Sequence, residues 1–130
     1  MEEGYKRLKI WQLSHGLAIK VHKMSLTLPK FETFEEGGQI RRSSKSVSAN
    51  IVEGYGLRHY KAEYIHYLIR SYASSLETVE HLEYLYETGS FQDEEIFNEL
   101  VSSYKELNKM LFRFIGSVEK QHGTEIFGND

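Results

Sequence analysis

The side chains best suited to chemistry lie in residues 39–54. Seven residues of this segment recur at spacings of three and four, which places them along one side of a helix. We call them the polar stripe: Gln39, Arg42, Ser43, Ser46, Asn50, Glu53 and Gly54. Such a stripe could form a hydrolytic site, an interface between subunits or a hydrogen-bond network between helices. A serine nucleophile needs a base within hydrogen-bond reach, and the segment contains no histidine. We therefore interpret the polar stripe as an interface or a buried network and expect no catalytic residue.

Two Glu-x-x-His pairs are the candidates for a metal site: Glu63 with His66, and Glu119 with His122. They resemble the spacing in di-iron bundles, where carboxylates and histidines project inward from four helices. His66 falls outside the apolar stripe of its segment, and no pair of inward glutamates completes the set. We expect surface histidines, no metal and no cofactor. The alternative is a metal-dependent or hydrolytic enzyme that uses these pairs or the polar stripe.

The spacing of apolar residues predicts the elements that position these side chains. Four helices are expected, over residues 8–26, 33–54, 61–87 and 92–120, with a tail at 121–130. Pro29 ends the first helix, because the residue before a proline is pushed out of helical geometry. Short links favour antiparallel neighbours. We predict an all-α fold, an antiparallel up-down-up-down four-helix bundle that forms one domain over residues 1–130.

The predicted second helix lacks bulk on its core side, where its larger residues are all β-branched. It can approach a neighbour closely, but its buried polar groups then need partners. The predicted third helix carries two stripes, which is more buried surface than one core requires. One consists of Ile65, Leu68, Tyr72, Ser75, Val79, Leu82 and Tyr86, and the other of Tyr64, Tyr67, Ser71, Ser74, Thr78 and Leu85. We therefore expect close neighbours, including other copies of the chain, to complete the packing. Phe31 and Phe34, in the first link, are expected to cap the end of the core.

Composition limits the class of protein. The chain has 130 residues, 40% of them hydrophobic, and no cysteine, so disulfides and thiolate chemistry are excluded. No segment approaches the roughly 20 apolar residues of a membrane span, and the N-terminus lacks the apolar core of a signal peptide. These features predict a cytoplasmic globular protein with no membrane association.

The net charge of -3 conceals an uneven distribution. In the predicted topology, one end of the bundle gathers the residues that we call the basic end: Lys6, Arg7, Lys9, Arg58, His59, Lys61 and Lys120. The opposite, acidic end gathers Glu32, Glu35, Glu36, Glu87, Asp93, Glu94 and Glu95. Clustered bases can bind phosphates, so the basic end is a candidate site for RNA or DNA. A solvated helix end is the alternative, in line with the pI of 6.1.

Residues 39–54, QIRRSSKSVSANIVEG, resemble the signature of the small bacterial four-helix bundle proteins encoded in intervening sequences of 23S ribosomal RNA genes, often labelled ribosomal-like. Trp11, Pro29 and residues 64–68 and 73–77 lie where that family would place them, and the resemblance covers about residues 8–118. It implies a ring-shaped homopentamer without enzymatic activity. One related branch, the accessory protein of diversity-generating retroelements, works with a reverse transcriptase and nucleic acid.

Together the sequence predicts a non-enzymatic homo-oligomeric protein with a structural or adaptor role. The expected partners are other copies of the chain, a pentamer by resemblance, and RNA, DNA or a nucleic-acid enzyme at the basic end.

Overall fold

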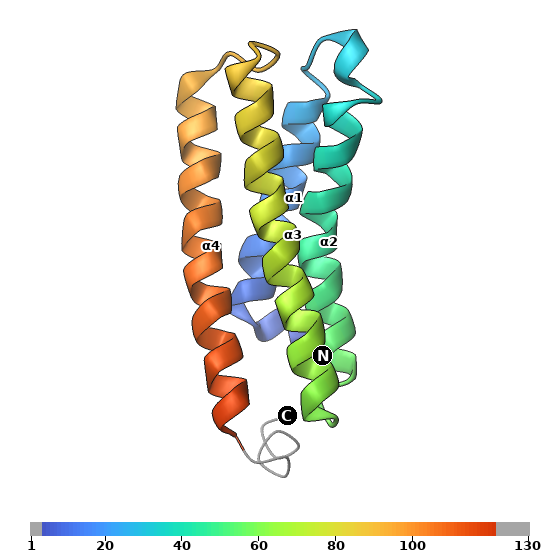
Figure 1. The fold of residues 1–130 in the computed structure, drawn as a ribbon, viewed down its shortest axis with the longest axis vertical. Coiled ribbons are helices and arrows are strands. Elements are labelled where there is room, and N and C mark those ends of the chain that lie inside the picture. Colours follow the sequence, from blue (N-terminus) through green and yellow to red (C-terminus); the bar gives the residue numbers. More distant parts are fainter. Residues whose placement is uncertain (1–3, 122–130) are drawn as a thin grey trace.

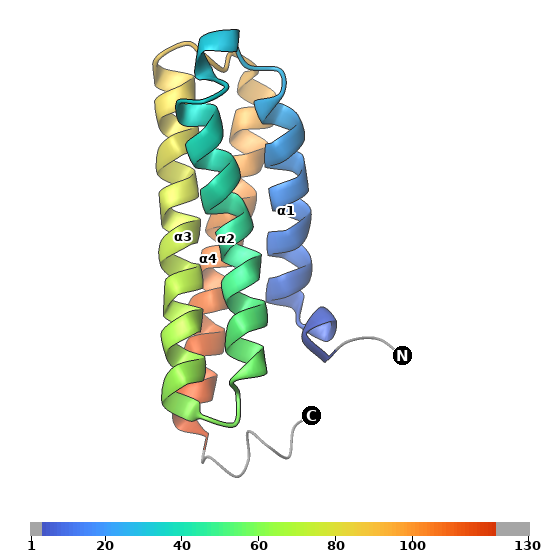
Figure 2. The same ribbon diagram turned by 90° about the vertical axis from the view of Figure 1, so that its right-hand side faces the viewer.

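The computed structural model describes residues 4–121 and shows four long helices side by side (Figure 1). In chain order the elements are the 3-10 helix η1 (Gly4–Arg7), α1 (Lys9–Ser25), the 3-10 helix η2 (Lys30–Glu32), α2 (Glu36–Gly56), α3 (Lys61–Glu87) and α4 (Glu94–Lys120). The links α1–α2 and α3–α4 lie at one end of the bundle and the link α2–α3 at the other (Figure 2). No strand occurs between residues 4 and 121. The predicted antiparallel up-down-up-down bundle is confirmed.

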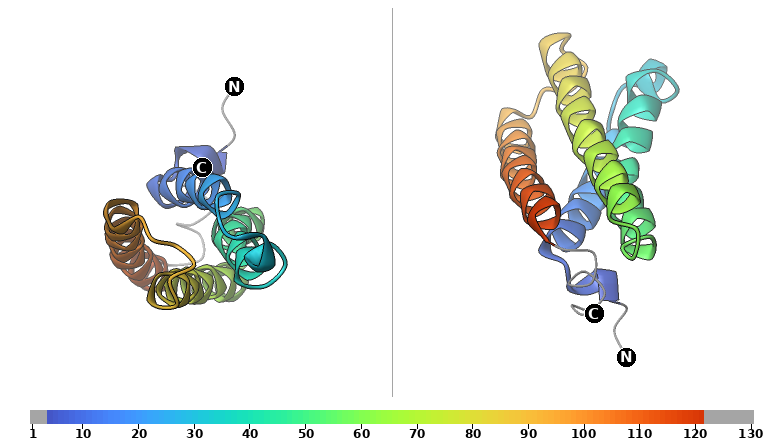
Figure 3. Two further views of the ribbon diagram at one scale, coloured as in Figure 1. Left: turned by 90° about the horizontal axis from the view of Figure 1, so that it is seen from above. Right: turned by 60° about the horizontal axis from the view of Figure 1, so that its bottom comes forward.

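The helices follow one another around the bundle axis in the order α1, α2, α3, α4 (Figure 3). Among adjacent helices, contacts are densest between α2 and α3 and sparsest between α1 and α4. The fully buried core side chains come from all four helices: Val21, Ile40, Val47, Ile51, Leu68, Leu82, Leu85, Tyr104, Leu107 and Leu111. No helix in the described part of the chain has the length and apolarity needed to cross a membrane.

The start of α2 differs from the prediction by three residues. The expected start at Thr33 is instead part of the turn that follows η2, and the helix begins at Glu36, whose backbone N–H donates to the Glu32 carboxylate at 3.4 Å. Gly37 is needed at this point, because a Cβ there would lie 2.5 Å from the carbonyl oxygen of Glu32. The missing side chain therefore allows the link to fold back over the first turn of α2.

The prediction that Phe31 and Phe34 cap the core is wrong. Their side chains are 70% and 90% exposed. Leu28 and Phe91, from the two links at this end, are buried in the core cluster instead. The short η2 helix accounts for the difference, because it turns the link back on itself and leaves both phenylalanines on its outer surface.

Arg41 fixes the link between α1 and α2 from inside the bundle. Its guanidinium donates to the Ser25 hydroxyl at 3.1 Å and to the Thr33 carbonyl at 2.6 Å. One side chain of α2 thereby joins the end of α1 to the connection that follows it.

Tyr104 places a hydroxyl group in the centre of the core. The residue is fully buried, and its hydroxyl has no hydrogen-bond partner among the described residues. Burial raises the pKa of the Tyr104 phenol, because the apolar surroundings disfavour the phenolate. An unpaired buried hydroxyl costs about 1–3 kcal/mol, so the hydroxyl of Tyr104 lowers the stability of the fold, whereas its buried ring stabilises the core.

We expect Tyr104→Phe to raise the free energy of unfolding at pH 7 by about 1 kcal/mol, because it removes the unpaired hydroxyl and keeps the ring. Tyr60→Phe, at a residue that is 66% exposed, is the matched control and should change little. Chemical denaturation of the three proteins measures the difference. A destabilised Tyr104→Phe protein would show that the hydroxyl is satisfied.

The same substitution should change the response to alkaline pH. Because the pKa of Tyr104 is raised in the folded state, its phenol ionises first in the unfolded chain as the pH rises. The free energy of unfolding is therefore unaffected by this ionisation below the unfolded-state pKa of about 10, and it falls above that pH. Between pH 10 and 11, wild-type protein should lose up to about 1.4 kcal/mol more than Tyr104→Phe. Parallel curves for the two proteins would contradict this reasoning.

Candidate functional site

The polar stripe divides between the surface and the contact of α2 with α3. Gln39, Arg42 and Glu53 are exposed, and no hydrogen bond or ion pair of Arg42 occurs among the described residues. Ser43 and Gly54 are buried. Ser46 and Asn50 are half-buried. The structure thus brings the small members of the stripe against α3 and leaves the long charged members in solvent.

Hydroxyl groups of α2 and α3 meet in pairs along this contact. Thr78 Oγ1 donates to Ser43 Oγ at 2.9 Å, and the hydroxyls of Ser46 and Ser74 lie 3.0 Å apart. The Ser71 hydroxyl donates to the Val47 carbonyl of α2 at 2.7 Å. These bonds satisfy polar groups that would otherwise be costly to bury.

The same contact extends to the end of α2 through Gly54. A Cβ at this position would lie 3.1 Å from the Tyr67 Cβ and 3.4 Å from the Tyr64 carbonyl oxygen. Gly54 therefore lets the last turn of α2 approach the first turns of α3. The helix continues through this glycine, so α2 ends at Gly56, two residues later than predicted.

The geometry of the polar stripe is that of a packing network. Ser43 donates back to the Ile40 carbonyl of its own helix. Asn50 Nδ2 donates to both the carbonyl and the hydroxyl of Ser46, each at 2.9 Å. The serine hydroxyls have partners that are carbonyls or other neutral groups, none of which could activate a nucleophile as a base does.

The Glu-x-x-His pairs do not converge within the described residues. Glu63 and His66 are both exposed on α3. Glu119 is exposed near the end of α4, and His122 lies outside the described residues. Between residues 4 and 121, no group of three or more His, Asp and Glu side chains is arranged to hold a metal ion.

The basic end contains residues with two different roles. Lys61 Nζ donates to the carbonyl of Glu119 at 2.6 Å and to that of Gln121, so this ammonium caps the end of α4. Arg58 donates to the Tyr55 carbonyl at 2.9 Å, and its guanidinium lies 4.2 Å from the centre of the Tyr55 ring. The remaining members are on the surface or half-buried, with exposed side chains at Arg7, Lys9, His59 and Lys120 and a half-buried one at Lys6.

The acidic end is partly built into the fold. Glu32 is buried, and its carboxylate accepts a hydrogen bond from the Ser90 hydroxyl at 2.6 Å. Glu36 Oε2 lies 2.6 Å from His81 Nδ1, while His81 Nε2 lies 3.2 Å from Glu77 Oε2. The four-residue spacing of Glu77 and His81 is a readable signal, but the sequence analysis did not use it. The arrival of Glu36 from α2 depends on the turn around η2 and has no sequence signal.

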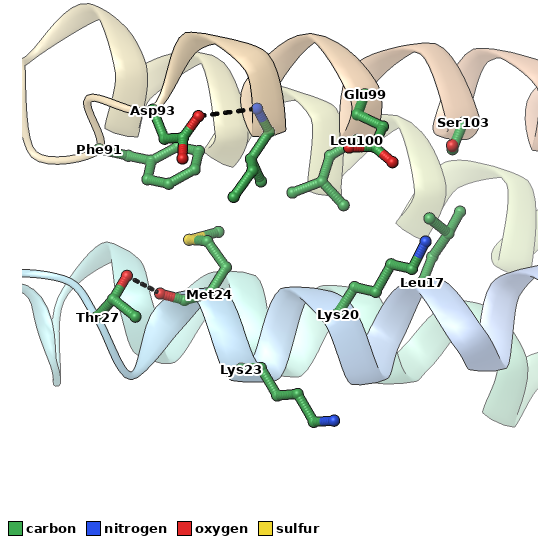
Figure 4. A pocket seen from close by; sticks show the side chains of 11 residues that line it. Leu17, Lys20, Lys23, Met24, Thr27, Phe91, Asp93, Glu99, Leu100 and Ser103 are labelled. Atoms are coloured by element: carbon green, nitrogen blue, oxygen red, sulfur yellow. Dashed lines mark hydrogen bonds between the residues drawn. The ribbon is translucent and has the colours of Figure 1, made fainter.

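A groove of about 590 Å³ opens between α1 and α4, where the helices have their sparsest contact (Figure 4). Its apolar lining includes Leu17, Met24, Phe91 and Leu100. Lys20 extends toward α4, whereas Lys23 points away (Figure 4). Asp93 and Glu99 complete the opposite rim. This lining is suited to binding an apolar group, and the sequence analysis did not predict it.

We expect Ser71→Leu to destabilise the fold by about 2–4 kcal/mol, because a larger side chain would force α2 and α3 apart and would remove the bond to the Val47 carbonyl. Ser102→Leu, on the exposed side of α4, is the control and should change the free energy of unfolding by less than about 0.5 kcal/mol. Thermal or chemical denaturation measures both. Equal effects would mean that the α2–α3 contact tolerates bulk.

Comparisons with known proteins agree with the architecture and with the motif in α2. The family model described as 23S rRNA-intervening sequence protein matches residues 6–113. The structure is similar to a crystal structure from Bacteroides thetaiotaomicron, described as a protein with unknown function from the S23 ribosomal protein family. The TM-score is 0.73 at 25% sequence identity, over 82% of this chain and 95% of that chain. No significant match was found among curated proteins. The resemblance carried by residues 39–54 is confirmed, and the chain belongs to the family of 23S rRNA-intervening sequence proteins.

Proposed function

We propose that this protein is a non-enzymatic, self-assembling helical bundle with a structural or adaptor role in the cytoplasm, and that it forms a ring of identical subunits, a pentamer by family resemblance. The observation that carries the proposal is a group of large apolar side chains left in solvent on one side of the bundle. Ile69 and Leu76 of α3 are 50% and 48% exposed, and Phe112 of α4 is 71% exposed.

These three side chains belong to one surface. Phe112 and Asn108 of α4 line a hollow together with Tyr72 of α3. Ile69 and Leu76 lie one turn to either side of Tyr72, at spacings of three and four, and therefore share its side of α3. Exposed apolar groups that gather on one face are typical of protein interaction sites. The buried Asn108 Oδ1, which has no hydrogen-bond partner among the described residues, lies at the same place.

We expect the native mass of the purified protein to be a multiple, greater than one, of the 15.2 kDa chain mass. Phe112→Ser should shift this mass toward a single chain, because it removes the most exposed apolar side chain of the face. Phe34→Ser is the matched control and should leave the mass unchanged. It changes a side chain that is 90% exposed in the link between α1 and α2. Light scattering or native mass spectrometry reads the result. A folded wild-type protein with the mass of one chain at micromolar concentration would end the proposal.

A second proposed activity is binding of RNA or DNA at the basic end. The supporting observation is that Arg7 and Lys9 line one hollow with Arg113 of α4, and that the exposed Lys120 follows at the last residue of α4. A ring would present this cluster several times on one rim, and repeated weak contacts bind a long polyanion far more tightly than one contact does.

The test uses Lys9→Glu combined with Lys120→Glu, because Lys61 and Arg58 are engaged in the fold. Binding of a fluorescent single-stranded RNA should weaken at least about tenfold. The slope of log K against log[salt] should become shallower by the equivalent of about two phosphate contacts. Lys20→Glu combined with Lys30→Glu makes the same change in net charge elsewhere and should have a smaller effect. Wild-type affinity that does not fall as salt rises would contradict nucleic-acid binding through charge.

A further inference from the structure

We propose that the α1–α2 side of one copy docks onto the α3–α4 side of the next copy, so that the bundles stand side by side in a closed ring. This inference rests on the self-assembly proposed above and names the two surfaces that would meet. The two sides are opposite faces of one bundle, because the helices follow one another around the axis in chain order (Figure 3).

The α1–α2 side is basic and hollowed. A depression of about 420 Å³ has a small apolar floor of Ala18 and Ile19 of α1, next to Ser48 of α2. Four basic side chains, and no carboxylate, complete its lining: His15, His22, Lys23 and Lys45. The sequence reinforces this charge, since residues 4–31 and 37–52 contain no Asp or Glu. Within these two stretches, no carboxylate of the same helix offsets the positive charge of Lys23 and Lys45.

The α3–α4 side is apolar around Phe112, where Lys109 and Arg113 of α4 also lie, and acidic along the second half of α3. Its apolar part is the surface formed by Ile69, Leu76 and Phe112. The stripe that contains Ile69 and Leu76 continues along α3 with carboxylates at Glu80, Glu83 and Glu87, again at spacings of three and four. Residues 76–99 hold eight Asp and Glu and no Lys or Arg. The second half of α3, with Glu80, Glu83 and Glu87 on this side, thus carries the negative charge that the α1–α2 side lacks.

The two surfaces lie at the same level along the bundle. Lys23 is near the end of α1 and Lys45 is in the first half of α2, so both are toward the end that holds the α1–α2 link. Glu80 and Glu83 are in the last third of α3, toward the same end (Figure 1). Two copies can therefore pair without sliding along their axes. A contact between two different faces closes into a ring when it involves rotation alone, whereas an axial shift would produce a filament.

The available area is sufficient for a stable contact. A helix of 27 residues, such as α3, is about 40 Å long, and two adjacent helices are about 20 Å wide. One side of the bundle therefore offers about 800 Å² to a partner, which is the usual contribution of one subunit to a specific interface.

A second copy explains these surfaces better than a nucleic acid does. A phosphate backbone would pair with Lys23 and Lys45, but it would leave Ile19, which is 45% exposed, without an apolar partner. It would also leave the acidic and apolar α3–α4 side without a role. A neighbouring α3 can supply both apolar contact and carboxylates to the α1–α2 hollow, as a helix docked in a groove does.

The experiment exchanges the charges of the two sides and measures native mass in about 0.15 M salt. One variant combines Lys23→Glu with Lys45→Glu, and the other combines Glu80→Lys with Glu83→Lys. Each should dissociate toward single chains, with the subunit affinity weakened at least about 100-fold by like-charge contacts. The variant with all four substitutions should assemble again, because both of its faces are reversed. Recovery in this variant shows a specific pairing and cannot result from a folding defect.

Lys20→Glu combined with Lys30→Glu is the charge control and should keep the wild-type mass, because neither residue lines the α1–α2 depression. A monomeric wild-type protein would overturn both the self-assembly and this inference. An oligomeric wild type whose mass is unchanged in both double variants would overturn only the inference. If Lys23→Glu with Lys45→Glu abolishes binding of single-stranded RNA while the mass stays the same, the α1–α2 side is a nucleic-acid site and the proposed docking is wrong.

Discussion

The close approach of α2 and α3 is the interaction on which the rest of the bundle depends. It is made of side chains that are both small and able to hydrogen-bond, with Ser43 meeting Thr78 and Ser46 meeting Ser74. The small volumes let the backbones approach, and the paired hydroxyls avoid the cost of burying polar groups alone. Neither small volume nor hydrogen bonding would suffice alone. Alanines would leave the register of the two helices less specific, and larger polar residues would push the two helices apart.

This close contact produces an uneven bundle. α2 lies tightly against α3 and also packs on α1, while α1 and α4 touch least and leave the apolar groove between them (Figure 4). The links at the α1–α2 end compensate in part. Arg41 ties the α1–α2 link to α1, and Glu32 ties the same link to the α3–α4 link. The groove between α1 and α4 is therefore bounded at one end by links that are held in place. Gly37 makes this arrangement possible through its missing side chain.

The distribution of charge has two components, one along the bundle and one across it. The sequence analysis predicted the first, a basic end opposite an acidic end. The structure adds the second, because α1 and α2 are neighbours and their outer side has basic residues, whereas the second half of α3 carries carboxylates. The component across the bundle combines with exposed apolar side chains, which is why we propose it as the contact between subunits. The component along the bundle gathers exposed bases such as Lys9 and Lys120 toward one end, which is why we propose that end as a site for a polyanion.

The sequence by itself determined the number, order and approximate limits of the helices, because apolar spacing and the positions of Pro29 and the glycines are local signals. It also determined that residues 39–54 form a small, polar packing surface. Only the tertiary structure decided which partner this surface meets: Thr78, Ser74 and Ser71 of the same chain occupy it, so the two stripes of α3 are both used within one bundle. Likewise, the exposure of Phe34 and the engagement of Lys61 with the end of α4 depend on how links and ends fold in space. Residue spacing fixes which side chains share a face of one helix, but the burial of that face is set by contacts between segments distant in the chain.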